Sequence, residues 1–468
     1  MGREMVILVT LIGYKILLIG IGLWASKRTQ TSQDFFIGGK TLGPWVAAIS
    51  SSASASSAWS LLGVSGAAYS MGLSALLLFP AIVGGYIFNW LWLAPKIRVL
   101  GNKTGAITLT QLLSGNGKYA KAIVIACSIA IIFSFAFYVA AQFQAAGGTF
   151  SSSFGMSTER AVITGTLIIL IYTLLGGFWA VSVTDTVQGM LMAAVAIMLP
   201  LVALWEIGGL GALIKALPEV YSSAQLSFSG EFYGWAAFAF VIGMLGIGLG
   251  NPGQPHVVNR FMAIENDSDM KTAKWVGIGW PIIVYGGMLL LGLCARVLLP
   301  VNANSEQVLF DLTNLLFHPI VAGVIVAAVL SAIMSTADSQ LLVAASSLSY
   351  DLKPASKPSN SLLWSRCTVV IMCMVSLLIA LFAPEAIFSR VLFAWAAIGS
   401  AFGPLLIVIL CGYKVSGKFR LAAILIGFCG TVAFNWQANA PGDILERVLP
   451  FVLSFAIVWW GRGEKRID

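Results

Sequence analysis

Residues 49–57 read Ile-Ser-Ser-Ser-Ala-Ser-Ala-Ser-Ser, and residues 243–255 read Gly-Met-Leu-Gly-Ile-Gly-Leu-Gly-Asn-Pro-Gly-Gln-Pro. Each stretch interrupts an apolar segment that is long enough to cross a membrane. Serine, glycine and proline at membrane depth weaken the helical hydrogen-bond ladder, and the freed carbonyl groups then need protein, water or an ion as a partner. We therefore expect both membrane helices to be broken. Serine-rich helix packing is the alternative for the first stretch when it is taken alone.

The composition around these stretches is that of a membrane protein. Of 468 residues, 58% are hydrophobic and 10% are charged, whereas soluble proteins are about 25% charged. So few ionisable groups cannot cover a water-facing surface, which excludes a soluble fold. Six cysteines without a paired spacing and two histidines leave no pattern for a zinc or iron centre. The sequence predicts an all-α polytopic membrane protein.

Thirteen apolar stretches predict about thirteen transmembrane helices in a single transmembrane domain, residues 1–468. The first stretch is too long for a signal peptide, contains Lys15 and lacks a cleavage site, so we keep it as a helix. The stretches are residues 5–25, 42–69, 72–95, 119–147, 158–176, 184–206, 233–252, 274–298, 318–348, 362–383, 387–413, 419–437 and 447–462.

Lysine and arginine are distributed unevenly between the two ends of these helices. When alternate loops are assigned to one side, that side carries 20 of the 27 basic residues and the other side carries 6. The positive-inside rule then places the amino terminus outside and the carboxyl terminus in the cytoplasm. The same distribution accounts for the net charge of +8, so no nucleic-acid partner is expected.

The two broken helices lie five helices apart and cross the membrane in opposite directions. This relation predicts two inverted five-helix repeats, residues 42–206 and 233–413, each opened by a broken helix. One peripheral helix at residues 5–25 precedes the repeats, and two peripheral helices at residues 419–462 follow them. Such repeats are typical of secondary transporters, which bind their cargo at the broken helices near the middle of the membrane.

A sodium site is predicted between the first broken helix and the helix at 318–348. The hydroxyls of Ser335 and Thr336 and the carbonyl of Ala332 lie at the same depth as the carbonyls of Ala53 and Ser56. Hard cations prefer oxygen ligands, and neutral oxygens favour a weakly held monovalent ion. The alternative is that these hydroxyls bond back to their own helix.

Two carboxylates and a histidine in or beside the predicted helices have open roles. Asp185 lies at the expected cytoplasmic start of a helix, where it is either a carboxylate favoured by the helix dipole or part of a second cation site or proton relay. Asp338 lies about ten residues from a helix end, where we expect it to face entering water. His256 is expected to be a structural residue at the membrane interface, next to Arg260.

Tyr138 and Gln142 are four residues apart on one predicted helix, so they share a face. Their ring and amide suit a small solute. The alternative is that Tyr138 packs against neighbouring helices with its hydroxyl satisfied.

These stretches together resemble the bacterial sodium:solute symporter family. The likeness spans nearly the whole chain, and five motifs occur in order. They are Phe36-Ile37-Gly38-Gly39-Lys40 with Leu42-Gly43-Pro44, the Gly176-to-Gln188 segment, Gly253-Gln254-Pro255-His256 with Arg260-Phe261-Met262-Ala263, Ser335-Thr336-Ala337-Asp338-Ser339-Gln340-Leu341-Leu342-Val343, and Ala394-Trp395 with Ala401-Phe402-Gly403-Pro404.

The resemblance implies a leucine-transporter-like fold, sodium at the predicted site, and a role for Asp185 in cation coupling. It also implies that substrate lies near Tyr138 and Gln142 and near the second break, at Ile247, Asn251 and Pro255. Members that carry proline have an aspartate at the position of Ala55, a tryptophan at that of Ile247 and a tyrosine at that of Asn251. The chain therefore departs from the proline carriers at three positions.

The sequence as a whole is interpreted as a symporter of the bacterial inner membrane. It would use the sodium gradient to import a small organic solute by alternating access, with L-proline as the leading candidate. A proton-coupled carrier or a solute sensor of the same fold is one alternative. An intramembrane enzyme is the other, and it would need a nucleophile with a base, or a set of metal ligands, at membrane depth.

Overall fold

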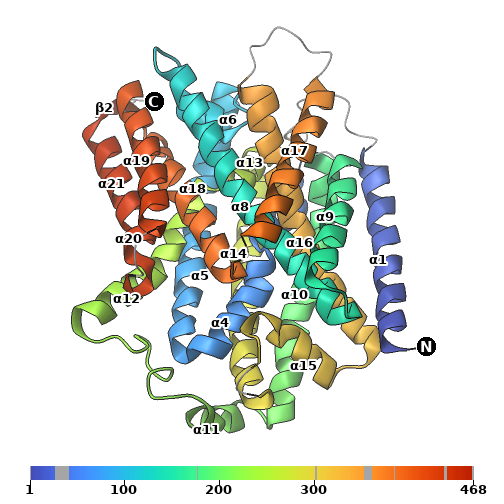
Figure 1. Cartoon of the computed structure of the whole chain (residues 1–468). Helices are drawn as coiled ribbons and strands as arrows, with labels where there is room; N and C mark the ends of the chain where they lie inside the picture. Colours follow the sequence, from blue (N-terminus) through green and yellow to red (C-terminus); the bar gives the residue numbers. More distant parts are fainter. Residues whose placement is uncertain are drawn as a thin grey trace.

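The computed structural model describes residues 2–26, 42–175, 178–300, 303–352, 361–383, 385–436 and 440–465. These residues form a bundle of helices with one small sheet at an end (Figure 1). The long helices are α1 (Arg3–Ser26), α8 (Ala120–Phe154), α9 (Thr158–Leu175), α10 (Phe178–Ile207), α14 (Asp267–Leu298), α16 (Pro319–Ser346), α17 (Ser361–Phe382), α18 (Ile387–Leu410) and α19 (Gly417–Asn435).

Shorter segments complete the bundle. They are α3 (Pro44–Ala55), η2 (Trp59–Gly63), α4 (Val64–Met71), η3 (Gly72–Leu77), α5 (Leu78–Phe88), η4 (Asn89–Leu93), α6 (Ala94–Thr104), α7 (Leu109–Ser114), α11 (Leu210–Val220), α12 (Gly234–Gly246), η5 (Ile247–Gly253), α13 (Pro255–Met262), η6 (Ser305–Gln307), α15 (Val308–Leu316), η7 (Ser347–Asp351), η9 (Pro441–Asp443), α20 (Ile444–Arg447) and α21 (Leu449–Trp460).

Within the described ranges, nine helical segments are long and apolar enough to cross a membrane. Each of the thirteen predicted stretches coincides with a helix or a broken helix, but some of these, such as α21 with 12 residues, fall short of that length. The helical membrane architecture is therefore confirmed, whereas the number thirteen and the inverted repeats stay predictions. Exposed side chains on the outer faces are apolar, for example Ile16 and Trp205, as contact with lipid requires.

The first predicted break is present. α3 ends at Ala55, and Ser56 leaves the helical region with φ −96° and ψ 83°. The chain resumes helical structure at Ala58 and continues through η2 and α4. Because a helix cannot bond its last carbonyl groups internally, those at the end of α3 are left for partners from other elements.

The second predicted break is also present. α12 ends at Gly246, the 3₁₀ segment η5 follows, and Gln254 is extended before α13 begins. Glycine is required here by a close backbone contact with α18. A Cβ atom on Gly399 would lie 2.4 Å from the Cα of Gly250, and a Cβ on Gly250 would lie 2.2 Å from the indole of Trp395.

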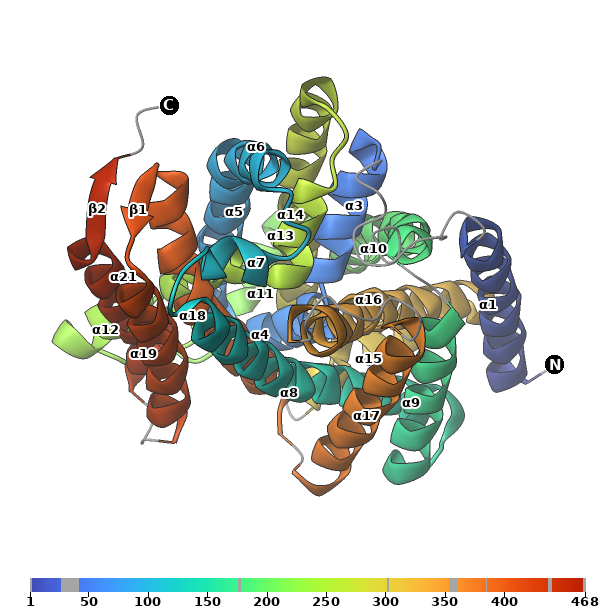
Figure 2. The same ribbon diagram turned by 90° about the horizontal axis from the view of Figure 1, so that it is seen from above.

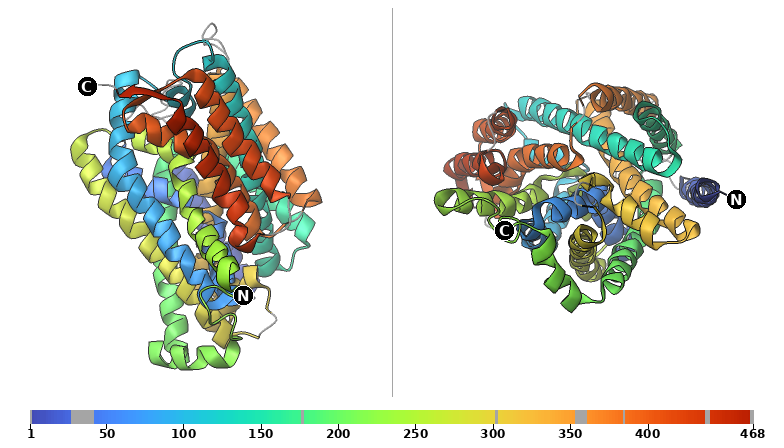
Figure 3. Two further views of the ribbon diagram at one scale, coloured as in Figure 1. Left: turned by 90° about the vertical axis from the view of Figure 1, so that its left-hand side faces the viewer. Right: turned by 60° about the horizontal axis from the view of Figure 1, so that its bottom comes forward.

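The two breaks lie inside the bundle, where η2 and most of η5 are buried, whereas α12 reaches the rim (Figure 2). α1 stands at the rim, packed on α16 and α10, and α19 and α21 stand at the opposite rim. α11 lies across one end of the bundle (Figure 3). The amino-terminal end of α1 and the strand β2 lie at opposite ends of the bundle (Figure 1).

A two-stranded antiparallel sheet closes the carboxyl-terminal part. β1 (Tyr413–Val415) follows α18, and β2 (Arg462–Lys465) follows α21. Tyr413 pairs with Lys465, and Val415 pairs with Arg462. The sheet therefore joins the ends of α18 and α21 through hydrogen bonds.

Substitution of Gly399 by Ala tests the contact between η5 and α18. We expect Gly399→Ala to lower the stability by about 1–3 kcal/mol, because overpacking of a close contact forces the backbones apart. Gly84→Ala on α5 is the matched control, since a Cβ there meets no atom within 4 Å and alanine favours a helix. Thermal unfolding in detergent measures both variants. An unchanged transition in Gly399→Ala would contradict the contact.

Candidate functional site

The predicted sodium residues of α16 meet the end of α3. The Ser335 hydroxyl donates to the Ala53 carbonyl at 3.2 Å and to the Ala332 carbonyl at 3.3 Å, and the Thr336 hydroxyl donates to the Ser54 carbonyl at 3.0 Å. All these residues are buried. The structure therefore brings Ala53, Ala332, Ser335 and Thr336 together. The alternative that both hydroxyls bond only within α16 is wrong.

Ser56, the fifth candidate, lies at the break itself. Its amide donates to the carbonyls of Ser52 and Ala53, and its hydroxyl accepts from the Trp280 indole at 2.8 Å. The Ser54 carbonyl is a contact that the sequence analysis missed. The last four carbonyls of a helix lack partners within the helix, so a helix end at Ala55 would have indicated that the Ser54 carbonyl is available.

The oxygen set around these contacts suits sodium. It consists of carbonyl and hydroxyl oxygens, which are ligands for hard cations. The hydroxyls of Ser52 and Ser54 are buried and have no hydrogen-bond partner. A sodium ion in this position would contact carbonyl oxygens of α3 and hydroxyl oxygens of α16, which are joined by hydrogen bonds in this structure.

Asp185 lies deeper than the sequence predicted. α10 begins at Phe178, so Asp185 is in the third turn of that helix and its side chain is 1% exposed. The alternative of a carboxylate at a helix start is therefore wrong. One oxygen, Oδ2, accepts from the Ser50 hydroxyl at 3.0 Å and from Arg260 at 2.8 Å, while Oδ1 has no partner.

Arg260 joins four elements around this carboxylate. Besides Asp185 on α10, its guanidinium donates to the Ser50 hydroxyl of α3, the Ser339 hydroxyl of α16 and the His256 carbonyl of α13. The side chain is 2% exposed. His256 is fully buried and packs against the Phe135 ring, and Asp338 is fully buried as well. The prediction of a water-facing Asp338 is wrong, because α16 turns this side chain into protein. The depth of His256 at the membrane interface stays a prediction, and its side chain packs inside the protein.

A second candidate region is a cavity of about 20 Å³ between the two breaks, large enough for one water molecule. Tyr138, Ile247 and Asn251 line it, as predicted for the substrate site. The other lining residues, which the sequence analysis did not select, are Ala55, Trp59, Ile82, Tyr86, Tyr285, Val391, Leu392 and Trp395. Aromatic residues in apolar helices carry no sequence signal that separates a lining position from a packing position.

Gln142 and Pro255 do not line this cavity. Gln142 accepts from the Ala58 amide at 3.0 Å, so its carbonyl oxygen holds the first residue after the break in α3, while its amide nitrogen has no partner. Tyr138 donates to the Ser57 hydroxyl at 3.3 Å. Pro255 opens α13 directly after Gln254, whose amide donates to the carbonyls of Gly250 and Trp395.

Two donors that line the cavity or lie against it are unpaired. The Tyr86 hydroxyl and the Trp59 indole nitrogen are buried without hydrogen-bond partners. By contrast, the Trp395 indole donates to the Ile247 carbonyl at 3.2 Å. Unpaired buried donors are costly, and a carboxylate in the cavity would satisfy them.

A hydrogen bond joins η6 to the start of α18 beside the cavity residue Trp59. The Glu306 carboxylate accepts from the Phe388 amide at 3.2 Å. Phe388 packs against Trp59 with ring centroids 5.7 Å apart. Burial raises the pKa of Glu306, and the backbone amides of Phe388 and Ile387 lower it. Glu306 therefore ties the loop before α15 to the residue that packs on Trp59.

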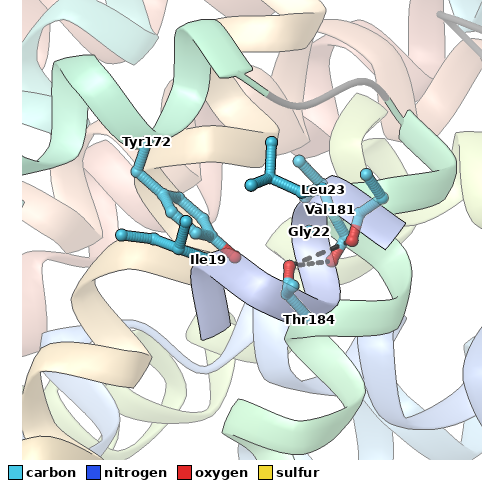
Figure 4. A pocket seen from close by; sticks show the side chains of 7 residues that line it. Ile19, Gly22, Leu23, Tyr172, Val181 and Thr184 are labelled. Carbon is cyan, nitrogen blue, oxygen red and sulfur yellow. Dashed lines mark hydrogen bonds between the residues drawn. The ribbon is translucent and has the colours of Figure 1, made fainter. Parts of the chain in front are cut away.

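A different small cavity lies between α1, α9 and α10 (Figure 4). Its lining is mostly apolar. The Thr184 hydroxyl there bonds back to the carbonyls of Ala180 and Val181. The oxygens available in this cavity are thus too few to hold an ion, and it is not a candidate for the sodium site.

Comparison with known proteins identifies the chain. The model of the sodium:solute symporter family matches residues 35–427. This chain belongs to the sodium:solute symporter family. Membership in a family of symporters makes it a transporter, which removes the intramembrane enzyme as an alternative.

Relatives at 30% identity or more cover nearly the whole chain. The high-affinity proline transporter PutP of Bacillus subtilis is 34% identical over 452 residues, 94% of each chain. The osmoregulated proline transporter OpuE of the same bacterium is 32% identical and covers 96% of this chain and 92% of its own. The sodium/proline symporter of Escherichia coli is 31% identical and covers 92% and 88%.

Solved structures show the fold. A Na⁺-coupled sialic acid symporter in a substrate-bound outward-open state matches with a TM-score of 0.81 at 18% identity, over 97% of this chain and 96% of that one. MhsT in complex with L-phenylalanine matches with a TM-score of 0.58 at 14% identity, over 89% and 98%. The fold is thus that of the leucine-transporter-like symporters.

Removal of either α16 hydroxyl tests the candidate ion site. We expect Ser335→Ala and Thr336→Ala each to raise the sodium concentration for half-maximal uptake roughly tenfold, because each removes an oxygen that bonds a charged group. Thr149→Ala is the matched control, since that buried hydroxyl bonds only to the Ala145 carbonyl of its own helix. Sodium-dependent uptake in proteoliposomes is the measurement. Equal sodium dependence in all three variants would refute the site.

Proposed function

We propose that this protein is a sodium-coupled importer of an amino acid, with L-proline as the leading candidate. The observation that carries the proposal is the meeting of the Ser335 and Thr336 hydroxyls with the carbonyls at the end of α3. The names of the relatives support proline as the solute. Ala55, Ile247 and Asn251 are the positions at which the chain departs from the proline carriers.

Sodium would be held by Ala53, Ser56, Ala332, Ser335 and Thr336, with the Ser54 carbonyl as a further ligand. The Ser335 and Thr336 hydroxyls donate to carbonyls of α3, so the same oxygens lie close enough together to share one ion. With the ion, these oxygens turn to sodium and fix the end of α3 against α16. An ordered break would raise the substrate affinity, and reciprocal coupling of this kind is typically about 1–3 kcal/mol.

Asp185 is proposed as part of a second cation site or as a coupling residue. Its Oδ1 atom is buried without a partner, and Arg260 already supplies one positive charge at Oδ2. A buried pair resists removal of either partner, since the remaining charge would be uncompensated. Movement of Arg260 would therefore change how strongly Asp185 attracts a cation.

The substrate is proposed to enlarge the cavity between the breaks and to contact Tyr138, Ile247 and Asn251, with Gln142 and Pro255 acting through the backbone beside it. An amino acid fits the groups present. Its carboxylate would accept from the Trp59 indole and the Tyr86 hydroxyl. Its ammonium would donate to η5 carbonyls that side chains already contact, such as the Ile247 carbonyl.

Alternating access would open the cavity to one side at a time. The contacts proposed to break when the cavity opens are the Glu306–Phe388 hydrogen bond between η6 and α18, and the Arg260 contacts that join α3, α10, α13 and α16. The cavity of about 20 Å³ is too small for an amino acid, so it would have to enlarge before substrate binds.

The remaining expectations belong to this proposal. They are two inverted repeats at residues 42–206 and 233–413, peripheral helices at 5–25 and 419–462, and a bacterial inner membrane with the amino terminus outside. The distribution of lysine and arginine supports this orientation. The start of α1 and β2 lie at opposite ends of the bundle, which supports termini on opposite sides of the membrane. The relatives are bacterial transporters, which supports a location in a bacterial membrane.

Uptake in proteoliposomes tests the function. We expect an inward sodium gradient to drive accumulation of labelled L-proline, because sodium fixes the break that the substrate needs. A proton gradient of the same size without sodium should drive none. Competition by a panel of amino acids then defines the substrate. Full uptake on a proton gradient alone would overturn sodium coupling.

Tyr138→Phe tests the substrate site. The hydroxyl donates to Ser57 at the break, so its removal loosens the wall of the cavity, and we expect the substrate affinity to fall roughly five- to tenfold. Equilibrium binding of labelled substrate at saturating sodium is the measurement. Unaltered affinity would assign the ring to packing alone.

A further inference from the structure

Lys15 is an unusual residue for its position. α1 stands at the rim of the bundle, and Lys15 is the one charged residue of this helix beyond its first turn, which holds Arg3 and Glu4. It lies 12 residues after Arg3, or about 18 Å along the helix, which is near the middle of the membrane. A charge at this depth is costly and normally faces a partner inside the protein.

The side of α1 that carries Lys15 packs on the sodium helix α16. The Tyr14 hydroxyl and the Ser331 hydroxyl lie 2.6 Å apart. One turn further along, the Lys15 ammonium contacts the thioether of Met334. The Tyr14 ring centroid lies 5.8 Å from the same ammonium. A thioether is a weak acceptor and the ring is neutral, so these contacts do not compensate the positive charge of this partly buried side chain.

Asp338 carries a negative charge on the same face of α16. It follows Met334 by one helical turn, so both side chains lie on one face of the helix. Its carboxylate is fully buried, accepts from the Thr173 hydroxyl of α9 at Oδ1, and has no partner at Oδ2. The Lys15 ammonium, which contacts Met334, therefore lies about one helical turn of α16 from Asp338.

Asp338 also follows Thr336 by two residues. Thr336 points to α3 and the candidate ion site, whereas Asp338 points to α9. A buried unit charge on the back of the same helix acts on an ion at its front, because the low dielectric of the interior screens it poorly.

We propose that Lys15 is the counter-cation of Asp338, and that this pair sets the sodium affinity of the site on the other face of α16. The inference rests on the proposed sodium site and adds a residue of a peripheral helix to it. When Lys15 and Asp338 are both charged, their electrostatic effects on the sodium ion nearly cancel. When Asp338 is neutral, the Lys15 ammonium repels the sodium ion.

Two variants and their combination test this inference by direct binding of ²²Na⁺ to the purified full chain and by the sodium dependence of uptake. Asp338→Asn leaves Lys15 uncompensated, and we expect the sodium concentration for half-saturation to rise roughly tenfold. Lys15→Met combined with Asp338→Asn removes both charges, and we expect half-saturation to return to within about threefold of the unaltered protein.

Tyr14→Phe is the matched control for a purely structural role. It removes the hydroxyl that contacts Ser331 at the same interface without changing charge, so half-saturation by sodium should stay unchanged. The maximal uptake rate, measured at saturating sodium, should differ little between the single and double variants.

The outcomes separate this inference from the proposed function. If the unaltered protein binds no ²²Na⁺, the proposed function fails. If it binds sodium but Asp338→Asn binds it equally well, the inference alone is overturned. The inference is also overturned if the double variant does not recover its sodium affinity. If the pair only anchored α1, the removal of Lys15 in addition to Asp338 would not restore binding.

Discussion

The carbonyl groups at the end of α3 are the constraint on which the rest of the structure depends. A helix that stops inside a membrane leaves its last carbonyls without internal partners, and an unsatisfied buried carbonyl costs about 1–3 kcal/mol. Ser335 and Thr336 meet this need from α16. Gln142 holds the other side of the break through the Ala58 amide, and Trp280 holds Ser56. The break is therefore a built element with partners from three helices.

Charged side chains lie on two sides of the neutral oxygens at the end of α3. Asp185 and Arg260 pair on one side of α16, where Ser339 joins them, and Asp338 accepts from Thr173 of α9 on another side. Buried charges survive in an apolar interior when each has a partner. With the proposed Lys15–Asp338 pair, the proposed ion site would lie between charges that oppose each other, which suits an ion that must be bound and then released.

The sequence was sufficient to predict the broken helices, because serine, glycine and proline crowded at membrane depth disfavour a continuous helix. It also predicted that the Ser335 and Thr336 hydroxyls lie near the end of α3. It could not place Asp185, since the helix start at Phe178 was hidden within an apolar run that begins with aromatic residues. It could not select Trp59, Tyr86 and Tyr285 as cavity residues, because their roles follow from how distant helices pack. The motif residues Phe36 to Lys40 and Gly176 lie outside the described ranges.

The small sheet at the end of the bundle has a mechanical consequence. β1 continues α18, which supplies one wall of the cavity, and β2 continues α21. α18, α19 and α21 are thereby closed into a ring of chain. A tilt of α18 would also move α19 and α21, which face the lipid. The viscosity of the lipid would therefore influence the transport rate.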